Sequence, residues 1–206
     1  MPRVSREQTE QNRAAIEEAS SRLFRERGLQ HVSLADLMGE AGLTHGGFYG
    51  HFESKDALAA SVCASAFEQS IQRWQERADR LPDAATAFTA IVDSYLSKKA
   101  RDMPGTSCPA TALAIDVARE PEGALVHDAF LQGLEGLVGV LTELHNSGDA
   151  AADRRRALVE MSTLVGAQAL ARATRGNAIS NELLEASRSH LAATHHPSER
   201  AGTQQN

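Results

Sequence analysis

Residues 33–56, which read SLADLMGEAGLTHGGFYGHFESKD, constrain the fold of this chain more than any other stretch. Ser33 is a good N-cap for a short helix, and Asp36 occupies the capping-box position three residues later. Gly42 lies where a left-handed residue ends such a helix, and Thr44 is placed to cap a second one. The stretch therefore predicts two short helices joined by a tight glycine turn, which is the plan of a helix-turn-helix motif.

A longer helix, from Thr9 to Gly28, is predicted before this motif. Apolar residues recur at helical spacing in all three helices, and we expect them to form one small core. These residues are Ile16, Ala19, Leu23, Phe24, Leu34, Leu37, Met38, Leu43, Phe48 and Phe52.

Burial of Phe48 and Phe52 leaves one face of the second short helix exposed. That face carries Thr44, His45, Gly46, Gly47 and Tyr49. Glycine inside a helix costs about 1 kcal/mol relative to alanine, so the two glycines need an explanation. Close approach of the backbone to a DNA groove or a phosphate is one, and tight packing between helices is the other. Tyr49 and His51 can bond phosphate oxygens, and His45 can reach a base edge or a phosphate.

Bulk charge gives no support to nucleic-acid binding, because the formal net charge of the chain is −6. Residues 1–55 carry seven Lys and Arg and eight Asp and Glu, a net charge of −1. The DNA-binding interpretation therefore depends on local geometry. Arg13 lies on a polar face of the first helix, where it either meets a phosphate or is a solvated helix arginine.

The rest of the chain is also predicted to be helical. Apolar residues make up 42% of the sequence and aromatic residues 4%, and few segments are rich in the residue types that favour strands. Proline and glycine breaks divide residues 56–196 into about six helices, one of which is expected over 83–101. We therefore predict an all-α fold of about nine helices. It comprises a three-helix DNA-binding domain (1–55), a larger helical ligand-binding and dimerisation domain (56–196) and a flexible tail (197–206).

The segment from about Ile16 to Leu58, with its helix ending LFRERG and the following SLADLMGEAGLTHGGFYGHFESKDAL, resembles the tetracycline-repressor (TetR) family of bacterial transcriptional regulators. The resemblance implies that the hydroxyl of Ser33 meets a phosphate and that the helix from Thr44 enters the major groove. It also implies that the side chains matching the family's tyrosine, histidine and lysine contact or position the DNA backbone. These are Tyr49, His51 and Lys55. Two positions depart from the family: Thr44 stands where Ser is frequent, and His45 stands where Lys or Arg is common.

For the larger domain, the resemblance implies a small-molecule pocket between the middle helices. The candidate lining residues are Phe67, Trp74, Phe88, Tyr95 and Phe130. Ordinary core packing is the alternative interpretation for each of them. Gly133, Gly136 and Gly139 follow one another at intervals of three, which either permits close helix packing or leaves room for a ligand.

The two cysteines, Cys63 and Cys108, do not indicate a disulfide framework. Cys108 follows a hydroxyl-rich turn near a predicted helix N-terminus, where the helix dipole and N–H groups lower a thiol pKa. Some regulators of the family that this chain resembles sense electrophiles or oxidants through a cysteine in this region. Cys108 is therefore a candidate sensor, with a small structural residue as the alternative, whereas Cys63 is predicted to be a buried core thiol.

Catalytic machinery is not predicted. The sequence shows no constellation of paired carboxylates, of nucleophile and base, or of metal-ligand spacing, so we expect no enzyme activity, no catalytic residue and no cofactor. His195-His196 is too short a tract to indicate a metal site. No apolar run approaches the ~18 residues of a membrane span, so no membrane association is expected. The predicted location is the cytoplasm, with the nucleoid when bound to DNA.

The function predicted from these features is a ligand- or redox-responsive transcriptional regulator that acts as a repressor. It would bind a palindromic double-stranded DNA operator as a homodimer formed through the last two long helices, 152–175 and 180–194. A small-molecule or electrophile inducer would release it. The alternatives are an architectural or activator DNA-binding protein with a vestigial body, a helical enzyme, and a helical interaction protein that never touches DNA.

Overall fold

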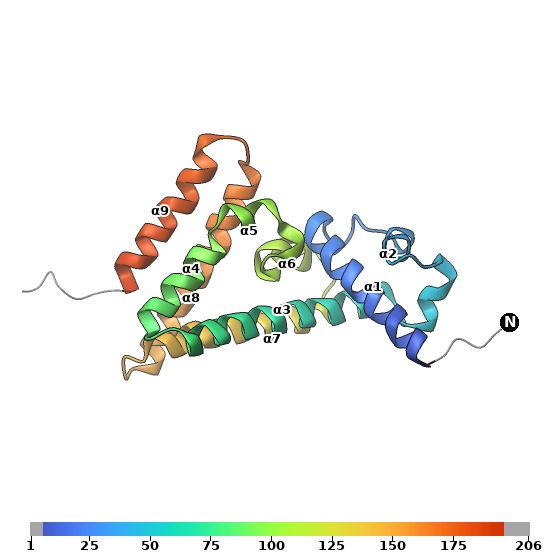
Figure 1. Ribbon diagram of the computed structural model, residues 1–206, viewed down its shortest axis with the longest axis horizontal. Helices are drawn as coiled ribbons and strands as arrows, with labels where there is room; N and C mark the ends of the chain where they lie inside the picture. Colours follow the sequence, from blue (N-terminus) through green and yellow to red (C-terminus); the bar gives the residue numbers. More distant parts are fainter. Residues whose placement is uncertain (1–5, 196–206) are drawn as a thin grey trace, which may run out of the picture. The chain divides into compact units, whose positions relative to one another are not determined.

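The computed structural model describes residues 6–195, and the regular structure within that range is helical (Figure 1). Nine α-helices and two short 3-10 helices, η1 and η2, occur in this part of the chain. Their bounds are α1 Arg6–Arg27, α2 Leu34–Glu40, η1 His45–Gly50, α3 Lys55–Arg80, α4 Ala84–Tyr95, α5 Lys98–Asp102, η2 Pro104–Thr106, α6 Pro109–Val117, α7 Leu125–His145, α8 Ala150–Ala173 and α9 Ala178–His195. The predicted all-α fold is confirmed. The predicted flexible tail, 197–206, lies outside the described residues.

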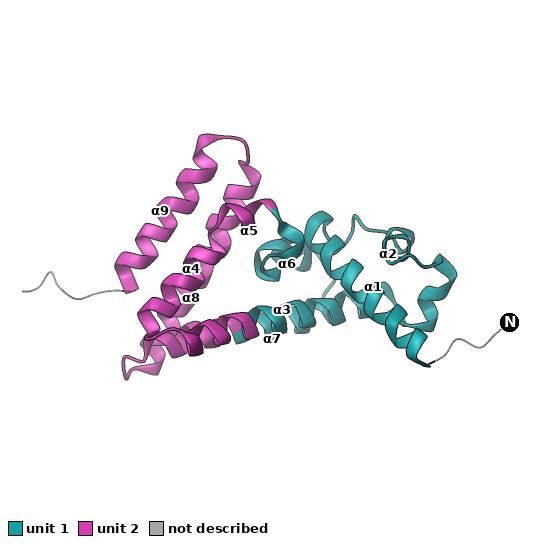
Figure 2. Cartoon of the chain, in the orientation of Figure 1, with its two compact units in different colours: residues 1–71, 103–136 teal, residues 72–102, 137–206 magenta. Residues whose placement is uncertain are grey.

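The chain divides into two compact units, shown in different colours in Figure 2. Within the described residues, the first unit comprises 6–71 and 103–136, and the second comprises 72–102 and 137–195. Helices α3 and α7 each contribute residues to both units. The predicted DNA-binding domain (1–55) and ligand-binding domain (56–196) do not coincide with these two compact units, and that functional division stays a prediction.

Local signals in the sequence set the start and end of the first helices. The capping box of α2 forms as predicted: Asp36 N donates to Ser33 Oγ at 3.1 Å, and Ser33 N donates to Asp36 Oδ2 at 2.9 Å. Gly28 (φ +86°) and Gly42 (φ +71°) adopt the left-handed conformation directly after α1 and in the turn after α2. Helix α1 begins three residues before the predicted start, so Thr9 lies inside the helix.

The small core beneath these helices has the predicted composition. Phe24, Leu37 and Phe48 are at most 1% exposed, and the other predicted members are buried except for two. Those two, Leu34 and Leu43, are half-buried.

Two expectations about helices were wrong. The second helix of the motif is the 3-10 helix η1, and the Thr44 side chain makes no capping hydrogen bond. Three of its six residues are glycine, which disfavours an α-helix, and 3-10 geometry is used in short pieces of this kind. The helix expected over 83–101 is two helices, because Ser97 Oγ accepts from Ala100 N at 3.1 Å and begins α5.

The glycines of α7 have different surroundings. A Cβ placed on Gly133 would overlap the buried ring of Phe67, and one on Gly136 would overlap Ile71, so these two glycines serve close packing against α3. A Cβ on Gly139 would meet nothing within 4 Å. No helix in the described part of the chain has the length and apolar character needed to cross a membrane.

We expect Gly133→Ala to lower the free energy of unfolding by about 1–3 kcal/mol, because the Phe67 ring has no room to move away from the added methyl group. Gly139→Ala is the matched control on the same helix, and it should be neutral or stabilise by up to about 1 kcal/mol. Urea unfolding followed by circular dichroism measures both. Equal midpoints for the two variants would contradict the packing argument.

Candidate nucleic-acid interface

The η1 segment is held by its aromatic residues and exposes the rest. Phe48 is fully buried and Phe52 is 6% exposed, with their ring centroids 5.9 Å apart. Tyr49 is 68% exposed and meets Phe48 edge-on at 5.3 Å, which leaves its hydroxyl facing outward. Thr44, His45, Gly46 and Gly47 are exposed beside it. The surface defined by these five exposed residues, 44–47 and 49, is called the recognition surface below.

The three glycines of η1, Gly46, Gly47 and Gly50, are not required by the chain's own packing. A Cβ on Gly46 or Gly50 would meet nothing within 4 Å, and one on Gly47 would make only ordinary contacts. None of the three has a positive φ. Tight packing between helices of this chain therefore does not explain these glycines, and close approach of their backbone to a DNA groove or a phosphate stays a prediction.

Arg13 lies beside the C-terminal end of η1. Its Nη1 donates to the His51 carbonyl at 2.7 Å, and its guanidinium lies 4.2 Å from the centroid of the Phe52 ring. It also pairs with Glu17 at 3.1 Å. Sequence reasoning missed this positioning role, because nothing in the local pattern links residues 38 apart. Its predicted phosphate contact stays a prediction.

The Ser33 hydroxyl is engaged within its own capping box. Ser33 Oγ donates to Asp36 Oδ2 at 2.5 Å while accepting from Asp36 N. These hydrogen bonds from Ser33 lower the pKa of the Asp36 carboxyl, so the carboxylate is the favoured form. A phosphate contact by Ser33 would have to share or replace the bond to Asp36.

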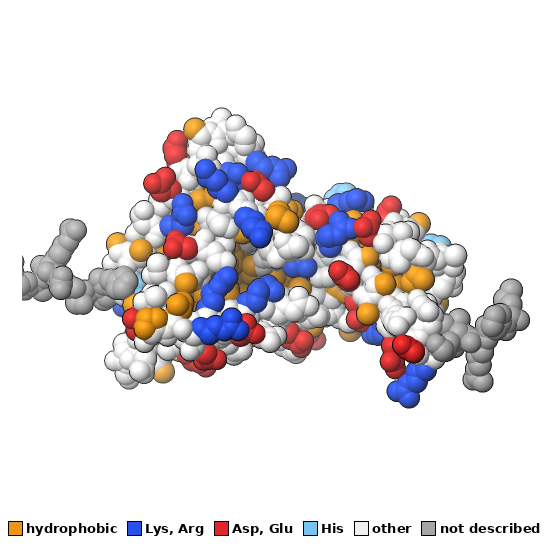
Figure 3. All heavy atoms as spheres, in the orientation of Figure 1, with side chains coloured by type: hydrophobic (Ala, Val, Ile, Leu, Met, Phe, Trp, Pro, Cys, Tyr) orange, Lys and Arg blue, Asp and Glu red, His pale blue; other side chains and the backbone are white. Residues whose placement is uncertain are grey.

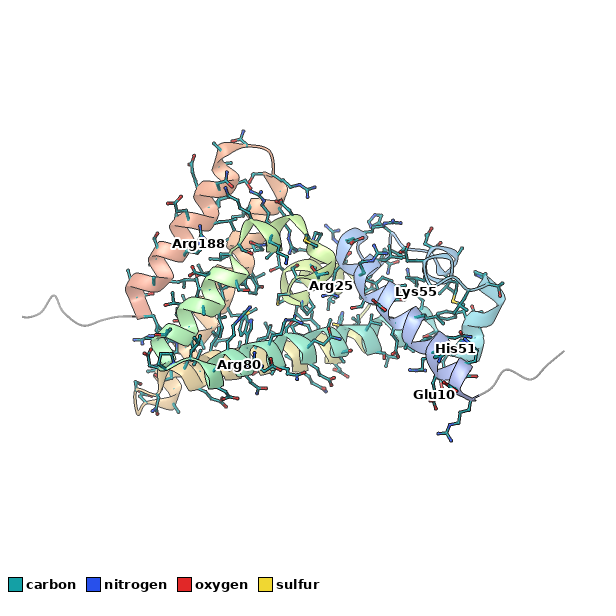
Figure 4. All side chains as sticks on the ribbon, viewed as in Figure 1. Glu10, Arg25, His51, Lys55, Arg80 and Arg188 are labelled. Atoms are coloured by element: carbon teal, nitrogen blue, oxygen red, sulfur yellow. The ribbon has the colours of Figure 1, made fainter. Side chains whose placement is uncertain are left out.

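Lys55, the first residue of α3, points toward the turn after α1. Its Nζ donates to the Leu29 carbonyl at 2.6 Å and lies 5.9 Å from the Phe24 ring (Figure 4). Burial lowers the pKa of its ammonium group, and the nearby Glu120 opposes that shift. The structure thus gives Lys55 an anchoring contact, while the predicted backbone contact remains untested.

The predicted sensor residue Cys108 is the N-cap of α6 and is half-buried. The preceding residue is tied to α1, because Arg25 Nη1 donates to the Ser107 carbonyl at 2.9 Å. The turn before it also packs closely, since a Cβ on Gly105 would lie 2.5 Å from Glu26 Oε1. Cys63 is buried as predicted, and burial raises its thiol pKa to about 12 despite the nearby Arg25 charge.

The predicted pocket aromatics fall into separate ring contacts. Phe67 and Phe130 meet edge-on at 5.3 Å within the first unit. Trp74 and Tyr95 meet at 6.0 Å within the second unit. Phe88 is fully buried, and its ring stacks on the ring of His195, also in the second unit. The ring contacts described here do not gather the five residues around a single site, and their role as ligand contacts stays a prediction.

Charge is not segregated on the visible face of the molecule. Figure 3 shows Lys and Arg side chains interspersed with Asp and Glu, without one continuous basic patch. Binding through the recognition surface would therefore depend on close fit and directed hydrogen bonds more than on a broad positive field.

Comparison with known proteins identifies this arrangement. The family described as bacterial regulatory proteins, tetR family, matches residues 16–62, which include α1, α2, η1 and the start of α3. Over this N-terminal segment the chain is similar to the TetR family. Its members are DNA-binding transcriptional regulators and not enzymes, as the sequence predicted.

Two curated relatives from Pseudomonas putida match this chain over its N-terminal part. The probable HTH-type transcriptional regulator ArpR is 36% identical over 83 residues, covering 39% of this chain and 40% of ArpR. The HTH-type transcriptional regulator TtgR is 38% identical over 68 residues, covering 33% of this chain and 32% of TtgR. The chain therefore matches well under half the length of these relatives.

Solved structures extend the likeness to the whole fold. The reduced form of Escherichia coli NemR superposes with a TM-score of 0.75 at 21% identity, covering 87% of this chain and 94% of NemR. At this level of identity the comparison shows that the two chains share a fold, with an N-terminal helix-turn-helix domain followed by a helical domain.

Proposed function

We propose that this chain is a TetR-family repressor that binds a palindromic operator as a homodimer, with residues 1–55 on the DNA. An inducer acting on residues 56–196 releases it. The observation that carries the proposal is the recognition surface: outward hydroxyl, imidazole and phenol groups flank glycines that the chain's own packing does not require. Operator-bound copies lie on the nucleoid and block access of the transcription machinery.

Base recognition falls on few side chains. His45 and Thr44 are the exposed donors next to the bare backbone of Gly46-Gly47, and Tyr49 stands where it can reach a phosphate. Each good base contact is worth about 1–3 kcal/mol of discrimination, so one recognition surface gives modest specificity. A two-fold dimer doubles these contacts along one face of the duplex, which favours a palindromic operator.

We expect His45→Ala to weaken binding to the operator by about tenfold or more while leaving affinity for random duplex unchanged, because a base contact is lost. Tyr49→Phe is the matched control, since it keeps the ring against Phe48 and removes only the hydroxyl. It should weaken both duplexes alike. The operator is selected by the wild-type protein from a random duplex pool, and affinities are measured by fluorescence anisotropy at fixed salt.

Two outcomes would contradict this assignment. Equal losses on operator and random duplex for His45→Ala would remove base reading from His45. Failure of the wild-type protein to enrich any palindrome would overturn operator binding itself.

The outward face of α8 supports the homodimer. Leu158, Val159 and Leu170 are 43%, 64% and 54% exposed, and the first two line an open hollow with Ser162 and Thr163. Between residues 157 and 171 the sequence has one ionisable residue, and it is buried. A second copy of this chain is the occupant we propose, because a two-fold axis would set this uncharged face against itself.

Several small or apolar residues of α8 and α9 serve packing within the chain. Ala157, Ala167 and Ala171 of α8, and Leu184 of α9, are at most 7% exposed and are buried within the chain. They pack α8 and α9 within one protomer, so the residues offered to a partner are the larger exposed ones.

We expect Val159→Arg to give a monomeric mass in light scattering at micromolar concentration, because a charge would be buried without a partner at the two-fold face. Ile115→Arg on α6 is the matched control, since Ile115 is also 64% exposed. It should keep the wild-type mass. A monomeric wild-type protein, or a dimeric Val159→Arg variant, would refute the proposed interface.

The inducer is either a small ligand or an electrophile, and Cys108 decides between them. NemR, which shares this fold, was solved in a form described as reduced, so a redox state is distinguished in that protein. Here the Cys108 segment is bonded to α1, which also contacts η1 through Arg13. Modification of the thiol would therefore disturb a helix that supports the recognition surface.

We expect a quinone or peroxide to release the wild-type protein from its operator and to leave Cys108→Ser bound. Cys63→Ser is the control and should respond like the wild type, because burial holds the Cys63 thiol in its unreactive protonated form. Operator release is followed by anisotropy and modification by mass spectrometry. Unchanged release of Cys108→Ser would assign induction to a ligand instead.

A further inference from the structure

Three potential metal ligands from three helices meet in the second unit. They are His145 at the end of α7, Glu160 within α8 and His195 at the end of α9. Their ligand atoms all lie within 4.8 Å of one another. The side chains of His145 and Glu160 are 1% and 3% exposed, so these two are shielded from solvent, whereas His195 is half-buried.

The Glu160 carboxylate is incompletely paired. Its Oε2 lies 2.8 Å from His145 Nε2, while its Oε1 is buried and has no hydrogen-bond partner within the described residues. Burial raises the pKa of Glu160 against the opposing influence of His145 and Arg156. A buried carboxylate oxygen without a partner is costly, and a bound cation would compensate it.

The imidazole rings are held in place by packing. The His195 ring stacks on the buried Phe88 of α4, with centroids 3.9 Å apart and an interplanar angle of 8°. The His145 ring lies 4.9 Å from the His195 ring. Fixed rings with nitrogen atoms near one carboxylate lose little freedom when they bind an ion, which favours a preorganised site.

We propose that His145, Glu160 and His195 form a binding site for a transition-metal dication of the zinc type. Two imidazole nitrogens and one carboxylate suit Zn²⁺, whereas Ca²⁺ and Mg²⁺ take mainly oxygen ligands. Three protein ligands leave a fourth position for water or an added ligand.

The distances permit this coordination after small movements. Zinc bonds of about 2.0–2.2 Å in a tetrahedron place ligand atoms about 3.4 Å apart. Ligand atoms that lie within 4.8 Å of one another would therefore close by at most about 1.4 Å, and the His145–Glu160 contact at 2.8 Å would open by about 0.6 Å. The ion replaces the hydrogen bond between His145 and Glu160 and binds the neutral imidazole.

Metal binding would join the ends of α7 and α9 to the middle of α8. The unfolded chain does not bring these residues together, so the ion stabilises the folded protein. The inference concerns the chain by itself and holds whether or not the proposed operator binding is correct.

The test uses the full chain after treatment with a chelator. Cobalt(II) is titrated in and followed by visible absorption, and zinc binding is measured by calorimetry and by the shift in Tm. We expect one equivalent per chain, an absorption spectrum typical of tetrahedral cobalt and a higher Tm with zinc. Glu160→Gln keeps the side-chain volume and should reduce affinity at least tenfold, as should His145→Ala.

His190→Ala and His196→Ala are the controls, because they remove neighbouring histidines and leave the three ligands intact. Both should retain wild-type affinity and the wild-type cobalt spectrum. Circular dichroism shows whether each variant is folded. If His145→Ala is not folded, the affinity of Glu160→Gln alone decides the test. Absence of wild-type binding at micromolar metal, wild-type binding by Glu160→Gln, or loss of binding in His196→Ala would overturn the site.

Discussion

The burial of Phe48 is the interaction on which the DNA-binding part of this protein depends. The η1 helix has three glycines in six residues, so it has little intrinsic stability. Full burial of the Phe48 ring, with Phe52 beside it, fixes the segment on the core, and Arg13 holds its end through the His51 carbonyl. The glycines then remain free to offer bare backbone on the opposite side.

Features encoded by neighbouring residues were predictable, and features made by distant residues were not. The Ser33 capping box and the left-handed Gly28 and Gly42 follow from local preferences, which act over three or four positions. The contact between Arg13 and His51 joins residues 38 apart, and only the packed structure reveals it. The 3-10 form of η1 was predictable in part. Its glycines are visible in the sequence, but the choice between the α-helical and 3-10 geometries is made by packing.

The histidine cluster shows the same limit in the second unit. In the sequence His195 stands beside His196, and a tract of two histidines does not indicate a set of metal ligands. Its structural partners, His145 and Glu160, are 50 and 35 positions away and come from two other helices. No periodicity within one helix predicts such a meeting. The candidate pocket aromatics show the same limit, because packing distributes them among separate ring contacts.

Helix α1 connects the Cys108 segment with the recognition surface within the first unit. Near its start, Arg13 bonds the end of η1, and near its end Arg25 bonds the residue before Cys108. Gly28, just past the helix, lies so close to Asp116 of α6 that a Cβ there would be 2.8 Å from a carboxylate oxygen. A helix is stiff along its axis, and interfaces this tightly packed do not deform gradually. We therefore expect a displacement of α6 to act on α1 through these contacts, and Arg13 joins α1 to the end of η1.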